Sequence, residues 1–132
     1  MKIAVGTDDS ETIHNGPFCG SKYFKVFEIL NAEVVDSLLR DNLVVTGEMI
    51  IQGHVKAGEV LRLLKDCSLF MGRSFGKEAV DDISSHGIDC ISTPIHGIED
   101  AVDSYLDGKL ENFSYYSPNL KVHRPCLRRP YT

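Results

Sequence analysis

The chain has 132 residues, of which 42% are hydrophobic and 25% are charged, and its net charge is -5. This composition fits one globular domain that buries a core without disulfides, and the negative charge argues against nucleic acid as a partner. No apolar run is long enough to cross a membrane, and no signal-peptide pattern precedes the first strand, which predicts a cytoplasmic location.

The first third of the chain predicts three strands. Residues 2–6 (KIAVG) form a short apolar run, and residues 23–30 (YFKVFEIL) carry apolar groups on both faces. A strand with two apolar faces is typical of a sheet that helices cover on both sides. Residues 33–40 (EVVDSLLR) follow a tight turn at Asn31 and Ala32. We expect these three strands to pair as an antiparallel meander.

The remainder of the chain alternates between helices and strands. Apolar residues recur at helical spacing in 57–64, 76–86 and 98–106, and the short apolar runs 67–71 and 88–92 lie between them. Crossovers of this length join parallel strands through right-handed connections. The order β-β-β-α-β-α-β-α therefore predicts an α/β fold with a mixed five-stranded sheet and helices on both faces.

Two segments lack a clear period. Residues 43–51 (LVVTGEMII) are too apolar for an ordinary loop and are predicted to form an extra hairpin. Residues 111–132 contain three prolines and are predicted to wrap the domain or to stay mobile. We therefore divide the chain into a domain at 1–110 and a C-terminal extension at 111–132.

The turn after the strand at 67–71 is a candidate ligand site, because ligands collect at the carboxyl ends of parallel strands. It reads Gly72-Arg73-Ser74-Phe75-Gly76 and opens a predicted helix. Backbone N–H groups at a helix start favour an anion, and Arg73 and Ser74 could assist. The alternative is a tight turn that uses glycine only for its geometry.

Acidic, histidine and cysteine side chains suggest a second kind of site. Asp8 and Asp9 follow the first strand and could bind a metal, act as acid and base, or simply cap the loop. Thiolate and imidazole together suit zinc, iron or an iron–sulfur cluster. Such groups lie in loops or at helix starts, where each alone is more often a surface or capping residue: His14, Cys19, His54 and His96.

Several segments, in this order and spacing, resemble the dinitrogenase iron–molybdenum cofactor biosynthesis family over residues 1–110: MKIAVGTDDS, SKYFKVFEI, Gly53-His54, LLKDCSLFMG and Gly87-Ile88. The resemblance implies a ribonuclease H-like fold without nuclease activity. It also implies transient binding of an iron–sulfur or iron–molybdenum cluster, and a protein that donates or accepts it. Where relatives often read H-F-G-R-S, this chain has P-F-C-G-S at 17–21, which places Cys19 in the first loop.

The leading hypothesis is a non-enzymatic metallocluster carrier. Cys19, His54 and His14 are its predicted ligands, with Asp8 and Asp9 nearby. One alternative is a metal-free interaction or regulatory module that uses 43–51 and the C-terminal extension. The other is a small-anion or nucleotide-binding protein that uses the turn from Gly72 to Gly76.

Overall fold

The computed structural model describes residues 1–43 and 57–126. Among these residues, no helix has the length and apolar character needed to cross a membrane. The described strands are β1 (Lys2–Thr7), β2 (Tyr23–Leu30), β3 (Glu33–Asp41), β4 (Leu69–Gly72), β5 (Asp89–Ser92), β6 (Ser114–Ser117) and β7 (Val122–Pro125). The described helices are the short 3-10 helix η1 (Phe18–Gly20) and the α-helices α2 (Ala57–Leu63), α3 (Lys77–Ser85) and α4 (Ile98–Leu106).

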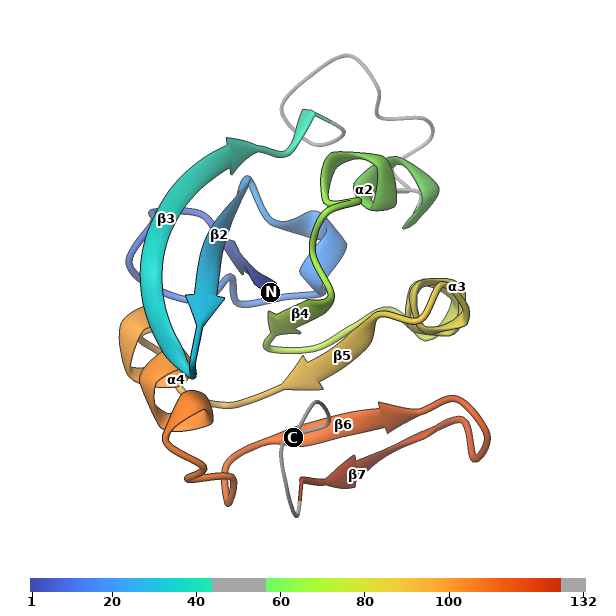
Figure 1. The fold of residues 1–132 in the computed structure, drawn as a ribbon. Helices are drawn as coiled ribbons and strands as arrows, with labels where there is room; N and C mark the ends of the chain where they lie inside the picture. The colour runs from blue at the N-terminus through green and yellow to red at the C-terminus, as the bar shows by residue number, and fades with distance from the viewer. Residues whose placement is uncertain (44–56, 127–132) are drawn as a thin grey trace.

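Within the described residues, the strands form one mixed sheet in the order β3-β2-β1-β4-β5-β6-β7 (Figure 1). β1 pairs antiparallel with β2, and β2 pairs antiparallel with β3, so the predicted meander is confirmed. β1 and β4 are parallel, as are β4 and β5. The α/β class and the parallel centre of the sheet are therefore as predicted.

The predicted number of strands was wrong, because the described sheet has seven strands rather than five. The two additional strands, β6 and β7, form a hairpin whose first strand pairs antiparallel with β5. Each has only four residues, which is too short for apolar alternation to stand out in the sequence. The described part of the extension from residue 111 thus continues the sheet. Of the hairpin predicted at 43–51, residues 44–51 lie outside the described residues.

The helices cover both faces of the sheet, as predicted (Figure 1). On one face, Ile3 and Val5 of β1 pack in a cluster with α4, whose Tyr105 is fully buried. On the other face, Ala4 of β1 and Phe70 of β4 pack in a cluster with α2 and α3. Successive residues of a strand point to opposite faces, so each central strand contributes to both cores.

Local sequence explains where the elements end. Asn31 and Ala32 have φ angles of 53° and 61°, and two successive positive φ angles match a tight hairpin turn between right-twisted strands. Gly87 and Gly108 have φ angles of 79° and 78° just beyond α3 and α4. Glycine enters this left-handed region without steric cost, which explains why α3 and α4 end just before these two residues.

Candidate functional site

The loop at residues 8–22 lies across the carboxyl ends of the parallel strands. The backbone N–H of Ile13 donates to the carbonyl of His96, which follows β5, at 2.8 Å. The N–H of Phe18 donates to the carbonyl of Ser74, which follows β4, at 2.9 Å. The edge of the sheet where a ligand was expected is therefore crossed by the chain itself, and the loop brings several predicted site residues to this edge.

Asp9 organises the beginning of this loop. Its Oδ1 accepts the backbone N–H groups of Glu11 and Thr12 at 2.9 and 2.7 Å, and its Oδ2 accepts the hydroxyl of Thr12 at 2.8 Å. The buried Thr7 hydroxyl adds a bond to the carbonyl of Thr12 at 2.6 Å. The backbone N–H groups of Thr12 and Glu11 lower the pKa of the Asp9 carboxyl to about 2. Both oxygens are used locally, which favours the capping interpretation of Asp9.

We expect Asp9→Ala to lower the free energy of unfolding at pH 7. In acid, the wild type and the variant should become equally stable. The folded-state pKa of about 2 lies below the ordinary 3.8, so the carboxylate stabilises the fold above pH 3.8, and this contribution disappears as the pH falls through about 2. Urea unfolding of the wild type and the variant between pH 7 and pH 2 measures the difference. Asp9→Asn is the control, since its amide oxygen can still accept the two N–H groups. If the difference in unfolding free energy between the wild type and Asp9→Ala stayed constant from pH 7 to pH 2, the capping role of the Asp9 carboxylate would be contradicted.

Asp8 and His14 form a pair on the outer side of the loop. The Nδ1 of His14 lies 2.7 Å from Oδ2 of Asp8, while Oδ1 of Asp8 accepts the N–H of Lys22 at 3.0 Å. Burial raises the pKa of Asp8, but the hydrogen bonds from His14 and Lys22 outweigh it and hold that pKa below its ordinary value. Because the carboxylate can only accept, His14 donates through Nδ1 and is held in one orientation.

The other ring nitrogen of His14 faces two glycines. A Cβ atom at Gly16 would lie 2.9 Å from Nε2 of His14, and one at Gly20 would lie 3.5 Å from it. A side chain at Gly16 would therefore collide with the ring nitrogen, and one at Gly20 would touch it. The side chain of His14 is 20% exposed. His14 thus has a carboxylate on Nδ1 and an Nε2 that lies beside two glycines, and a carboxylate on the far ring nitrogen is usual for a metal-binding histidine.

Cys19 is turned into the core. It is only 7% exposed and belongs to the cluster beneath α2 and α3. Burial raises the pKa of the Cys19 thiol to about 11, so the thiolate needed for metal binding is scarce at neutral pH. Burial likewise raises the pKa of the Cys90 thiol, to about 12. Cys67 and Cys126 are also buried and free.

The turn after β4 is used mainly for packing. A Cβ atom at Gly72 would lie 3.2 Å from the ring of Phe18, so glycine permits the loop to approach β4 closely. The carbonyl of Ser74 holds the loop through the N–H of Phe18. Arg73 differs: its Nη2 lies 3.3 Å from Nδ1 of His96, and its Nε is buried with no hydrogen-bond partner among the described residues.

The two histidines at this edge differ in chemistry. Arg73 can only donate, so Nδ1 of His96 accepts and the hydrogen of a neutral His96 ring sits on Nε2. His14 has the opposite arrangement, with hydrogen on Nδ1 and a lone pair on Nε2. His14 is therefore the better metal ligand of the two. His54, the other predicted histidine ligand, lies outside the described residues.

Two residues that position the site were not singled out from the sequence. The ring of Phe18 stacks on Phe70 and contacts Phe24 at a tilt, both at 4.9 Å between ring centres, and anchors η1 in the core. The fully buried Asn42 donates through Nδ2 to the carbonyls of Cys19 and Ser21 at 2.9 and 2.8 Å. An aromatic residue within a polar loop signals the first role, whereas no sequence pattern signals the second.

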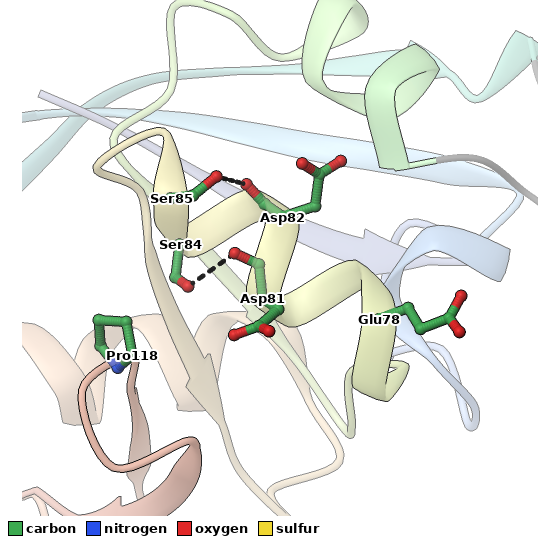
Figure 2. Close-up of a pocket in the computed structure, with 6 residues that line it drawn as sticks. All are labelled: Glu78, Asp81, Asp82, Ser84, Ser85 and Pro118. Atoms are coloured by element: carbon green, nitrogen blue, oxygen red, sulfur yellow. Dashed lines mark hydrogen bonds between the residues drawn. The ribbon is translucent and has the colours of Figure 1, made fainter.

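A separate groove lies between α3 and the β6–β7 hairpin and has a volume of about 520 Å³ (Figure 2). Its polar groups are largely engaged: the hydroxyls of Ser84 and Ser85 donate to carbonyls of their own helix, and Asp81 accepts the hydroxyl of Tyr116 at 2.8 Å. We therefore assign it no ligand. Its lining residues are Glu78, Asp81, Asp82, Ser84, Ser85 and Pro118.

Across residues 1–43 and 57–126, no three histidine, cysteine or acidic side chains are grouped closely enough to hold a metal ion. The described part of the chain thus supplies the Asp8–His14 pair rather than a complete metal cage. Together, the mixed sheet and the loop across its carboxyl edge define an α/β domain in which Asp8 orients the imidazole of His14 at that edge.

Comparison with known proteins identifies the family. The family model described as dinitrogenase iron-molybdenum cofactor matches residues 1–108, so the chain belongs to that family and the predicted resemblance is confirmed. A crystal structure of a candidate dinitrogenase from Methanocaldococcus jannaschii is similar at 17% identity and a TM-score of 0.65, covering 89% of this chain and 95% of that one. A candidate NifB protein from Thermotoga is similar at 14% identity and a TM-score of 0.59, covering 82% and 89%. These likenesses show the fold alone. None of the curated proteins matches the chain.

Proposed function

We propose that this protein is a non-enzymatic carrier that transiently binds an iron–sulfur or iron–molybdenum cluster, with His14 as its accessible ligand. Membership of the family supports a role in the synthesis or binding of the iron–molybdenum cofactor. The observation that carries the proposal is the orientation of His14, whose Nδ1 lies 2.7 Å from Asp8 and whose Nε2 faces Gly16 and Gly20. Second-shell carboxylates of this kind fix the ring and raise its basicity toward a metal.

A site to which the described residues contribute one accessible ligand, His14, suits cargo better than a resident cofactor. A structural metal site usually closes with four protein ligands, whereas the described residues group no three candidates together. One imidazole holds a preassembled cluster weakly enough for release. A donor or acceptor protein could then replace this imidazole with its own ligands.

The other predicted ligands have different roles in this proposal. Cys19 would have to leave the core and lose its proton before it bound iron, so we place it second to His14. Asp8 orients the histidine, and Asp9 holds the loop. His54 stays a predicted ligand, since it lies outside the described residues. A cytoplasmic location also stays a prediction.

The proposal extends to the fold. The order β3-β2-β1-β4-β5, with β2 antiparallel to its neighbours and β4 and β5 parallel to β1, supports a ribonuclease H-like core to which the β6–β7 hairpin is added. The catalytic carboxylates of a nuclease would have to converge at the carboxyl edge of the sheet. Here the loop at residues 8–22 crosses that edge, and Asp8 and Asp9 bond to its groups, which supports a binding role without hydrolysis.

Anaerobic reconstitution with ferrous iron and sulfide tests the carrier function. We expect the wild type to take up iron and to develop visible absorption, and His14→Ala to lower affinity at least about tenfold, since even the loss of a partner that only orients a ligand costs about 10- to 100-fold. Asp8→Asn should weaken binding less, because the amide can still orient the ring. Cys67→Ala is the control for loss of a buried thiol. A wild type that stays colourless and iron-free would refute the proposal, and full binding by His14→Ala would refute the ligand assignment.

A second candidate function is small-anion binding at Arg73. It rests on the buried Nε of Arg73, which has no hydrogen-bond partner among the described residues, and on the neighbouring His96. Thermal unfolding with increasing inorganic phosphate tests it. Stabilisation that Arg73→Ala abolishes and His14→Ala preserves would support this function, since a ligand that binds the native state raises the unfolding temperature. Equal responses in both variants would contradict it.

A further inference from the structure

The edge strand β3 exposes apolar side chains along most of its length. Val35 is 54% exposed, Leu38 is 48% exposed and Leu39 is 44% exposed. Proteins usually protect a free edge with proline, lysine or a covering element, because unpaired backbone groups there recruit other strands. β3 contains neither proline nor lysine, although four of its nine residues are charged, and its pairing with β2 is irregular only around Val35, so the stretch from Asp36 to Asp41 is regular. Among the described strands, β3 is the last on its side of the sheet, and its outer edge is therefore suited to accept another strand (Figure 1).

The backbone groups that face outward on β3 can be identified. The N–H of Asn42 donates to the carbonyl of Lys22 at 2.9 Å, so it faces β2. Backbone groups alternate in direction along a strand, so those of Leu38 and Arg40 also face β2, while those of Ser37 and Leu39 face outward. In agreement, the N–H of Ser37 bonds to the side chain of Asp36 at 2.8 Å. Leu39 thus offers a donor and an acceptor at the edge and Ser37 an acceptor, while the Ser37 N–H would exchange Asp36 for a carbonyl of the added strand.

We propose that β3 pairs with β3 of a second copy of this chain, antiparallel about a two-fold axis at Leu38. In this register Ser37 of one copy lies opposite Leu39 of the other, and their outward backbone groups can bond in both directions. Leu38 of one copy lies opposite Leu38 of the other in a non-hydrogen-bonded pair, the kind in which the two Cα atoms are closer together. Asp36 lies opposite Arg40 on the same face, and the symmetry repeats this pair of opposite charges twice.

Charge distinguishes this register from its neighbours. A two-fold axis normal to the sheet must pass beside one residue of the strand. An axis at Asp36 or at Arg40 would place that charge opposite itself, and an axis at Ser37 would place Glu33 opposite Asp41. An axis at Leu39 would pair no opposite charges. The axis at Leu38 alone among these five joins acid to base.

The surroundings of Arg40 strengthen this complementarity. Both oxygens of Asp66 accept from the guanidinium of Arg40 at 2.6 Å, and Lys2 also lies 3.1 Å from Asp66. Two cations therefore surround one carboxylate, which leaves net positive charge around Arg40, although its terminal nitrogens already bond to Asp66 and to the carbonyl of Leu63. The opposite edge of the sheet is less suitable, because β7 has four residues and includes Pro125. Pairing of β3 with β7 would also continue without closing.

Disulfide trapping tests the proposed register. We expect Leu38→Cys to form a covalent dimer in mild oxidant at least about ten times faster than Leu39→Cys, since only Cα atoms close across the axis can be bridged. The four native cysteines are buried and give a low background. Equal rates for the two variants, or a faster rate for Leu39→Cys, would overturn the register.

Sedimentation of the wild type over a range of concentrations tests the dimer itself. We expect a monomer–dimer equilibrium that Asp36→Lys weakens at least about tenfold, because lysine would then face Arg40. Asp103→Lys, the same change at an exposed site on α4, should leave it unaltered. A monomer at every concentration would overturn the proposal. The proposal would also be overturned if Asp36→Lys left the dimer intact, or if Val122→Lys on β7 weakened the dimer as much as Asp36→Lys does.

Discussion

Replacing Phe18 with alanine is expected to lower the free energy of unfolding by about 3–5 kcal/mol, the range for removing a buried aromatic ring. Phe18 is 1% exposed, and its ring centre lies 4.9 Å from those of Phe24, which is tilted, and Phe70, which is stacked. Its ring also fills the space above Gly72. The truncation therefore leaves a cavity between the loop and the sheet, and little of that cavity can collapse because β2 and β4 are fixed by the sheet.

Phe75→Ala is the matched control, measured by urea unfolding alongside Phe18→Ala. Phe75 lies 5.3 Å from the ring of Phe18 but is only partly buried, so its loss should cost clearly less. Phe18→Ala should also speed hydrogen exchange at residues 13–21, because the ring anchors that loop. Equal destabilisation by the two substitutions, or unchanged exchange in the loop, would contradict the role of Phe18 as the anchor.

The parts of the fold that depend on local pattern could be predicted from the sequence. Two-sided apolar character identified β2 as an internal strand, and helical spacing located α2, α3 and α4. Chain order and crossover length then gave the central parallel strands. The β6–β7 hairpin was missed because its pairing with β5 depends on tertiary contact rather than on any period in four residues.

The candidate site was predictable where its partners are close in sequence. Asp8 and His14 are six residues apart in one loop, and their pairing follows from that proximity. The inward direction of Cys19 could not be foreseen, because it depends on how Phe18 anchors η1 on the core. The role of Asn42 was equally hidden, since it meets the loop more than twenty residues away along the chain.

Asn42→Leu is expected to destabilise the protein by about 2–4 kcal/mol, because two buried carbonyls lose their donor and each unsatisfied group costs about 1–3 kcal/mol. Those carbonyls belong to Cys19 and Ser21, at 2.9 and 2.8 Å from Nδ2. Urea unfolding measures the loss, and Asn119→Leu in an exposed turn is the control. A loss no larger than that of the control would show that Asn42 does not hold the loop.

Asn42→Asp separates the loss of a donor from a change of shape. Its carboxylate would face two carbonyl oxygens in a buried site, so its pKa should rise above the ordinary value for aspartate. Because this pKa is higher in the folded than in the unfolded state, Asn42→Asp should lose little stability below the unfolded-state pKa. The loss of stability then grows as the pH rises through the folded-state pKa. The variant should therefore be closer to wild type at pH 4 than at pH 7, whereas Asn42→Leu should show the same deficit at both.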